Sequence, residues 1–218
     1  MTNLLQSIFG NIENESDRGA VLIAQEIIDD QLTDLLRKSA PSGISLKKLD
    51  SLLKYPGVFS SFSAKADVAY FAGLIGNNIY NSIDTFRRIR NSAAHDSKSF
   101  SLEPHRTQLV EVYRKLGNFG ETPMEDVLRH FAIKLYIEPL ADSLLEKFKE
   151  EGIDGVEPVF RDRQEIIQHI GSDPKTLRVA TDKLAKIELG LAIVFLCGLI
   201  LASGETSIQS RISKEKQA

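Results

Sequence analysis

The sequence predicts an all-α fold in which several helices form a bundle and a long apolar helix lies near the C-terminus. Two observations support this prediction. Apolar residues recur at intervals of three and four in successive segments, the spacing of one face of an amphipathic helix. Capping residues, prolines and glycines separate these segments, and we find no alternation of apolar and polar residues typical of a β-hairpin.

The first half of the chain predicts a series of helices with clear start and stop signals. Ser16 can cap the first of them, whose outer face carries a row of acidic residues that would repel a DNA phosphate. Pro41 and Pro56 break the chain on either side of a short helix. Ser63 can cap the next helix, which we expect to be central because it is apolar on all sides. The expected bounds are 17–39, 46–53, 64–75, 79–94 and 101–117.

The second half begins with a strong start signal, the capping box at residues 122–125 with proline at its first helical position. Pro139 should kink or split that helix after Glu138. A long loop is expected over 152–161, and a short helix then reaches Gly171. The last helix begins around Pro174 and should end before Gly204.

We therefore expect a single helical domain over residues 1–218. Its parts are a core at 13–117, a helical addition at 118–173 and an apolar C-terminal helix at 174–204 that packs on the core or in a dimer. The most apolar run, 189–202, is shorter than the roughly 20 residues that span a membrane. We interpret it as a buried core or interface helix, and we expect a homodimer.

Composition restricts the classes of function. The formal net charge of −3 gives no global attraction for nucleic acid, so we expect weak or no direct DNA binding. The single cysteine, Cys197, lies in an apolar run, which excludes an internal disulfide and favours a core role. Residues 1–10 carry no signal-peptide pattern, so we expect a cytoplasmic protein. The histidines lie far apart, and we expect neither a metal nor a cofactor.

The run Arg90-Asn91-Ser92-Ala93-Ala94-His95 is the one chemically suggestive motif. On a helix that turns about 100° per residue, Arg90 falls in the middle of the apolar stripe that faces the core. A charge there must be paired or must face a seam where an anion arrives. Asn91 and His95 are one turn apart and can touch, whereas Arg90 and His95 diverge by about 140°. Arg90 and His95 converge only if the helix loosens, if Arg90 curls round, or if a two-fold dimer pairs two motifs.

Such residues suit metal-free RNA cleavage. The arginine would hold the scissile phosphate, and the histidine would transfer a proton at the 2′-hydroxyl or the leaving oxygen. The candidate catalytic residues are Arg90, Asn91 and His95. The alternative is structural, with Arg90 paired to a carboxylate such as Asp17 and His95 at the helix C-terminus.

Three motifs resemble the family of mannitol operon repressor (MltR-like) proteins. They are residues 15–20, with Asp17 and Arg18; residues 62–75; and the Arg-Asn-to-His motif at 89–95. The resemblance covers about 13–117, and 118–173 has no counterpart. It implies a transcriptional regulator that acts through protein or nucleic-acid contacts. Arg87, Arg88, Arg18 and Asp17 are candidate binding residues.

The same motif resembles the HEPN superfamily of helical domains, many of which are RNA-cleaving toxins or defence nucleases. That resemblance implies a HEPN-like multi-helix bundle, a dimer, and Arg90, Asn91 and His95 at a shared cleft. Three functions therefore stay open: an MltR-like regulator, a metal-independent ribonuclease, and a helical interaction module without activity.

Overall fold

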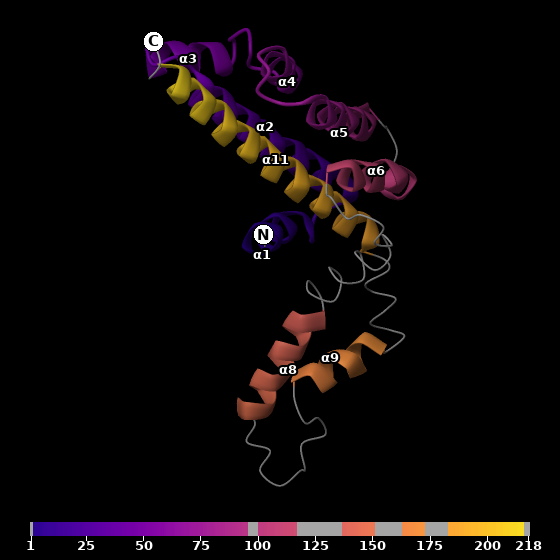
Figure 1. Ribbon diagram of the computed structural model, residues 1–218. Coiled ribbons are helices and arrows are strands. Elements are labelled where there is room, and N and C mark those ends of the chain that lie inside the picture. Colours follow the sequence, from indigo (N-terminus) through magenta and orange to yellow (C-terminus); the bar gives the residue numbers. More distant parts are fainter. Residues whose placement is uncertain (1, 96–99, 117–136, 151–162, 173–182, 216–218) are drawn as a thin grey trace. The chain divides into compact units, whose positions relative to one another are not determined.

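The computed structural model describes residues 2–95, 100–116, 137–150, 163–172 and 183–215 (Figure 1). All regular secondary structure in these ranges is helical, so the predicted all-α class is confirmed. The chain forms two compact units. The first combines Met1–Asn118 with Glu188–Ala218, and the second is Phe119–Ile187, which contains most of the expected addition at 118–173.

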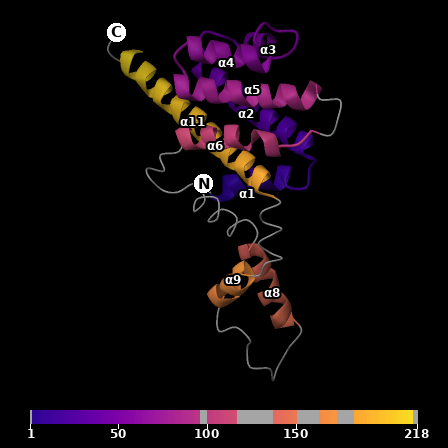
Figure 2. The ribbon, with the colours of Figure 1, turned by 90° about the vertical axis from the view of Figure 1, so that its right-hand side faces the viewer.

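The first unit holds most of the described helices (Figure 2). In chain order these are α1 (Thr2–Ile12), α2 (Asp17–Ser39), α3 (Leu46–Leu53), α4 (Phe62–Phe71), α5 (Asn77–His95), the 3-10 helix η1 (Glu103–His105), α6 (Arg106–Leu116) and, from Glu188 onward, α11 (Leu184–Glu215).

Helix α2 is the centre of this unit and packs against α1, α4 and α5. It begins as predicted, because the Ser16 side chain accepts a hydrogen bond from the amide of Gly19. Its buried stripe includes Ala24, Ile28 and Leu32, each with no exposed surface. This packing fixes the start of α2 close to the segment that follows α5, since the Asp17 carboxylate accepts a hydrogen bond from the amide of Leu102.

Helix α11 is the second core element. The expected end before Gly204 is wrong, because the helix continues to Glu215. Gly204 serves close packing rather than termination: a Cβ added there would lie 3.0 Å from Cδ1 of Leu35 on α2. The segment Leu184–Thr206 has the length and apolarity to cross a membrane, yet 61% of its most apolar window is buried inside the protein, as in the core helix of a soluble fold.

Two other helices differ from the sequence prediction. Helix α1 was not predicted, although Ile8, Phe9 and Ile12 bury its inner face. Helix α4 is capped by Ser61 instead of the predicted Ser63, and it ends at Phe71. It is not central either, since the Phe71 side chain is almost fully exposed. An even spread of apolar residues therefore does not show which face of a short helix is buried.

The second unit contains α8 (Glu138–Glu150) and α9 (Arg163–Ser172), which pack through a small apolar core around Ile137, Ala141 and Ile166. Pro139 lies in the first turn of α8, where a missing amide hydrogen costs nothing. The helix that Pro139 was expected to kink or split lies largely outside the described residues. The capping box at 122–125, the loop at 152–161 and the predicted helix start near 174 lie outside the described residues.

Candidate functional site

Helix α5 carries most of the residues that the sequence singled out. Its inner face is formed by Ile79, Ile83, Phe86, Ile89 and Ala93, all buried. The helix is regular α-helix from Asn77 to His95, so these positions keep their predicted angular order. The motif therefore lies on a straight, core-packed scaffold.

Arg90 lies half-buried on this helix, and its Nε atom is buried without a hydrogen-bond partner among the described residues. The structural pairing with Asp17 considered above is wrong, because no ion pair or hydrogen bond joins the two side chains in the described part of the chain, and Asp17 accepts a hydrogen bond from the amide of Leu102 instead. Other arginines behave differently, since each holds a carboxylate in a hydrogen-bonded ion pair. These are Arg37, Arg87, Arg88, Arg106 and Arg163. Arg90 thus has donor capacity that the described part of the chain does not use.

Asn91 and His95 are exposed on the outer surface of α5, one turn apart. Because the helix does not loosen before His95, Arg90 and His95 remain about 140° apart around its axis. One chain therefore does not present Arg90 and His95 on the same face of the helix. A shared cleft would need a curled arginine or a second copy of the chain.

Arg87 and Arg88 both hold Asp84, one turn earlier on α5. Arg87 Nε and Arg88 Nε each lie 2.9 Å from a separate oxygen of this carboxylate. Partial burial raises the pKa of Asp84, but the two guanidinium groups outweigh that effect and hold the pKa below its usual value. One carboxylate thus balances two cations, and this stretch of α5 keeps a net positive charge. The remaining candidate, Arg18, is half-buried at the start of α2.

Two buried ion pairs were not anticipated. Glu188 on α11 is 1% exposed, and both its oxygens accept hydrogen bonds from Arg106, at 2.9 Å each. Burial raises the pKa of Glu188, and the pairing with Arg106 only partly offsets this. Lys65 on α4 is also buried and is paired with Asp29 on α2. The sequence signal was an acid within an apolar run and a lysine within an apolar helix.

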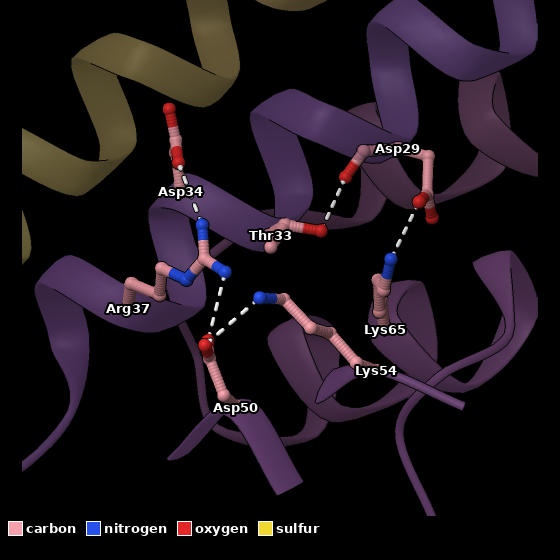
Figure 3. A network of polar contacts seen from close by, with 7 residues as sticks. All are labelled: Asp29, Thr33, Asp34, Arg37, Asp50, Lys54 and Lys65. Carbon is pink, nitrogen blue, oxygen red and sulfur yellow. Dashed lines mark hydrogen bonds and ion pairs between the residues drawn. The ribbon is translucent and has the colours of Figure 1, made fainter. Parts of the chain in front are cut away.

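Figure 3 shows that the Lys65–Asp29 pair lies beside a second, more exposed network. There Asp50 accepts from both Arg37 and Lys54, and these two contacts lower its pKa. Both networks tie α2 to the helices next to it in sequence. These ion pairs have a structural role, because each cation contacts a carboxylate of the same chain.

The described residues offer no group of three or more histidine, cysteine, aspartate or glutamate side chains that could hold a metal ion. Cys197 is buried as predicted, and its surroundings raise the pKa of the thiol to about 12, so it is not a nucleophile. No family model, no curated protein and no solved structure matches this chain.

A groove that the sequence did not predict lies between α5 and α6, with a volume of about 370 Å³. Its walls are mostly amide and hydroxyl side chains, with Arg88 at one end and Lys115 at the other. Sequence reasoning missed it because the groove depends on how two helices pair, which their separate patterns do not specify.

Proposed function

We propose that the protein is a regulator similar in type to the mannitol operon repressor family. In this proposal the protein acts by binding a protein or nucleic-acid partner through the surface of α5. The observation that carries this proposal is the unpartnered Nε of Arg90, on a helix whose other arginines are paired. Because the Nε atom itself is buried, an anionic group supplied by a partner would meet the terminal nitrogens of this half-buried guanidinium, with which no described carboxylate is paired.

Binding fits the geometry of α5 better than catalysis does. Acid–base cleavage needs the phosphate-holding and proton-transferring groups on one reacting centre, within hydrogen-bond reach of it. Arg90 and His95 are on different faces of a regular helix, so a single chain would not bring them to one phosphate. A binding surface has no such requirement. The regulatory role is expected in the cytoplasm, and an interaction module without activity is its simplest form.

The second candidate is a HEPN-type, metal-independent ribonuclease built on a HEPN-like bundle. The unpartnered Arg90 also favours this function, because such an arginine could stabilise the charge that develops on a phosphate. This candidate needs a dimer that places Arg90 of one copy beside His95 of the other. Cleavage of RNA without metal is the activity it predicts.

The experiment that tests the binding role follows the arginine side chains by NMR. The full-length protein, labelled with ¹⁵N on arginine, is titrated with a single-stranded RNA 12-mer and separately with inorganic phosphate. We expect the Nε–H signal of Arg90, identified by its loss in Arg90→Lys, to shift with at least one of these anions, while the signal of the internally paired Arg106 does not. An unmoved Arg90 signal with both anions would contradict the proposal.

A further inference from the structure

The groove between α5 and α6 has a volume of about 370 Å³ and is lined by side chains of both helices. Helices α5 and α6 run antiparallel (Figure 2), so Asn78 and Lys115 lie toward one end of the groove, and Arg88 and Thr107 toward the other. The ten-residue separation of Asn78 and Arg88 spans about 15 Å of helix. An extended chain of about four or five residues has the same length.

The floor and walls of this groove offer hydrogen bonds that the chain itself does not use. The Ser82 and Thr85 hydroxyls donate to carbonyl oxygens of their own helix. By contrast, the exposed carboxamides of Asn78 and Asn81 have no hydrogen-bond partner within the described ranges. Each carboxamide presents one acceptor and two donors, which match the carbonyl and amide of an extended peptide backbone.

Charge in the groove favours an acidic partner. Glu111 and Lys115 balance each other across 3.3 Å. Arg88 shares Asp84 with Arg87, so that end of the groove keeps one excess positive charge. The Arg88 side chain is 76% exposed and can turn donors toward a bound carboxylate.

The lining also discriminates between classes of partner. None of the described lining residues is aromatic, which leaves nothing on which the bases of a single-stranded nucleic acid could stack. Val112 is the one apolar residue among them, and the other apolar surface comes from the aliphatic parts of polar side chains. An amphipathic helix would therefore find no row of apolar anchor sites. Most of the groove is uncharged and offers hydrogen bonds, and one excess positive charge remains at the Arg88 end. This combination suits an extended peptide that carries an acidic side chain.

We propose that the groove between α5 and α6 binds an extended peptide segment of a protein partner, with the carboxamides of Asn78 and Asn81 on its backbone and Arg88 on an aspartate or glutamate side chain. This inference deepens the proposed function, because it names the partner's chemistry. It uses another face of α5: Arg90, five residues after the groove residue Thr85, lies about 140° away around the helix.

The test is selection of a random linear heptapeptide library on the full-length protein, followed by affinity measurements for the enriched peptides by fluorescence polarisation. The expected peptides share an acidic residue at one position. Asn81→Leu should weaken them about tenfold or more, equal to about 1.4 kcal/mol. Arg88→Glu should select lysine or arginine at that position. Lys47→Glu, the same charge reversal on exposed α3, is the control and should leave the peptides and their affinities unchanged.

Three outcomes would overturn the groove assignment. They are the absence of any enriched peptide, peptides that bind Asn81→Leu and Arg88→Glu as well as wild type, and an RNA 12-mer whose binding both variants abolish. If the NMR signal of Arg90 does not shift when anions are added, the proposed function is contradicted, but the peptide selection can still succeed. The failure of one proposal can therefore be distinguished from the failure of the other.

Discussion

At the scale of single residues, the Arg106–Glu188 pair explains how α11 can hold a buried carboxylate. Glu188 is 1% exposed, and a buried carboxylate without a partner is expensive. Arg106 satisfies both of its oxygens in a bidentate arrangement. The pair also couples α6 to α11 at the point where the chain re-enters the first unit.

Replacing Arg106 by methionine should therefore destabilise the protein by about 3–5 kcal/mol at neutral pH. The folded-state pKa of Glu188 is already above its unfolded value of about 4.3, and loss of Arg106 should raise it further. The stability that this carboxyl contributes is present below the unfolded pKa and is lost as the pH rises through the folded pKa.

Urea unfolding from about pH 4.5 to about pH 7 measures this effect. Arg106→Met should lose more stability over this interval than wild type, and a second substitution, Glu188→Gln, should restore much of it at pH 7. An Arg106→Met protein that is as stable as wild type at pH 7 would contradict the structural role of the pair.

Arg90 should behave in the opposite way. Because no described carboxylate is paired with it, Arg90→Met leaves no buried charge behind. We expect the free energy of unfolding to stay within about 1 kcal/mol of wild type or to rise. A rise is expected because groups that serve binding often lower the stability of the free protein. The same urea series measures this, with Arg106→Met as the matched control. A loss as large as that of Arg106→Met would show that Arg90 is structural.

At the scale of helices, the sequence predicted those with a clear cap and a one-sided apolar stripe. Helix α2 begins at its predicted cap, and α3 and α5 lie within two residues of their predicted bounds. Helix α1 was missed because its short apolar run was considered only as a possible signal peptide. The end of α11 was misplaced because Gly204 was interpreted as a helix terminator, whereas it lies within the helix at a close approach to Leu35.

A matched pair of glycine substitutions in α11 tests that explanation. Gly204→Val adds atoms where a Cβ would already lie 3.0 Å from Leu35, and should cost about 1–3 kcal/mol. A Cβ at Gly198 meets nothing within 4 Å, so Gly198→Ala should stabilise the helix by about 0.5–1 kcal/mol. Thermal melts of both variants measure the difference. Equal effects of the two substitutions would mean that α2 and α11 do not pack closely.

At the scale of the whole molecule, the sequence located the motif but not its surroundings. The spacing of residues 90–95 on a helix was enough to place Arg90 inward and to separate it from His95. The Asp84 pairs join residues three and four apart on α5, so their spacing could have predicted them. The loss of Asp17 as a partner and the groove beside α6 depend on contacts between segments that are distant in the sequence. Local periodicity contains no information on such contacts.

Assembly is a further prediction at this scale. Most of residues 187–200 of α11 are buried, but Leu201 is 40% exposed and lies near the exposed residues Gly198 and Ala202. We expect this apolar strip to contribute to a homodimer. Light scattering should give twice the chain mass at micromolar concentration, and Leu201→Asp should shift the population toward monomer. A wild-type monomer at that concentration would contradict the prediction.

The central proposal is that this protein acts by binding a partner and not by cleaving RNA, and a cleavage assay in EDTA tests this proposal most directly. Wild type, Arg90→Ala and His95→Ala are incubated with a labelled single-stranded RNA and the products are separated on a denaturing gel. We predict intact RNA with all three proteins, since Arg90 and His95 lie on different faces of α5. Cleavage by wild type that both folded variants abolish would contradict the claim and establish the ribonuclease.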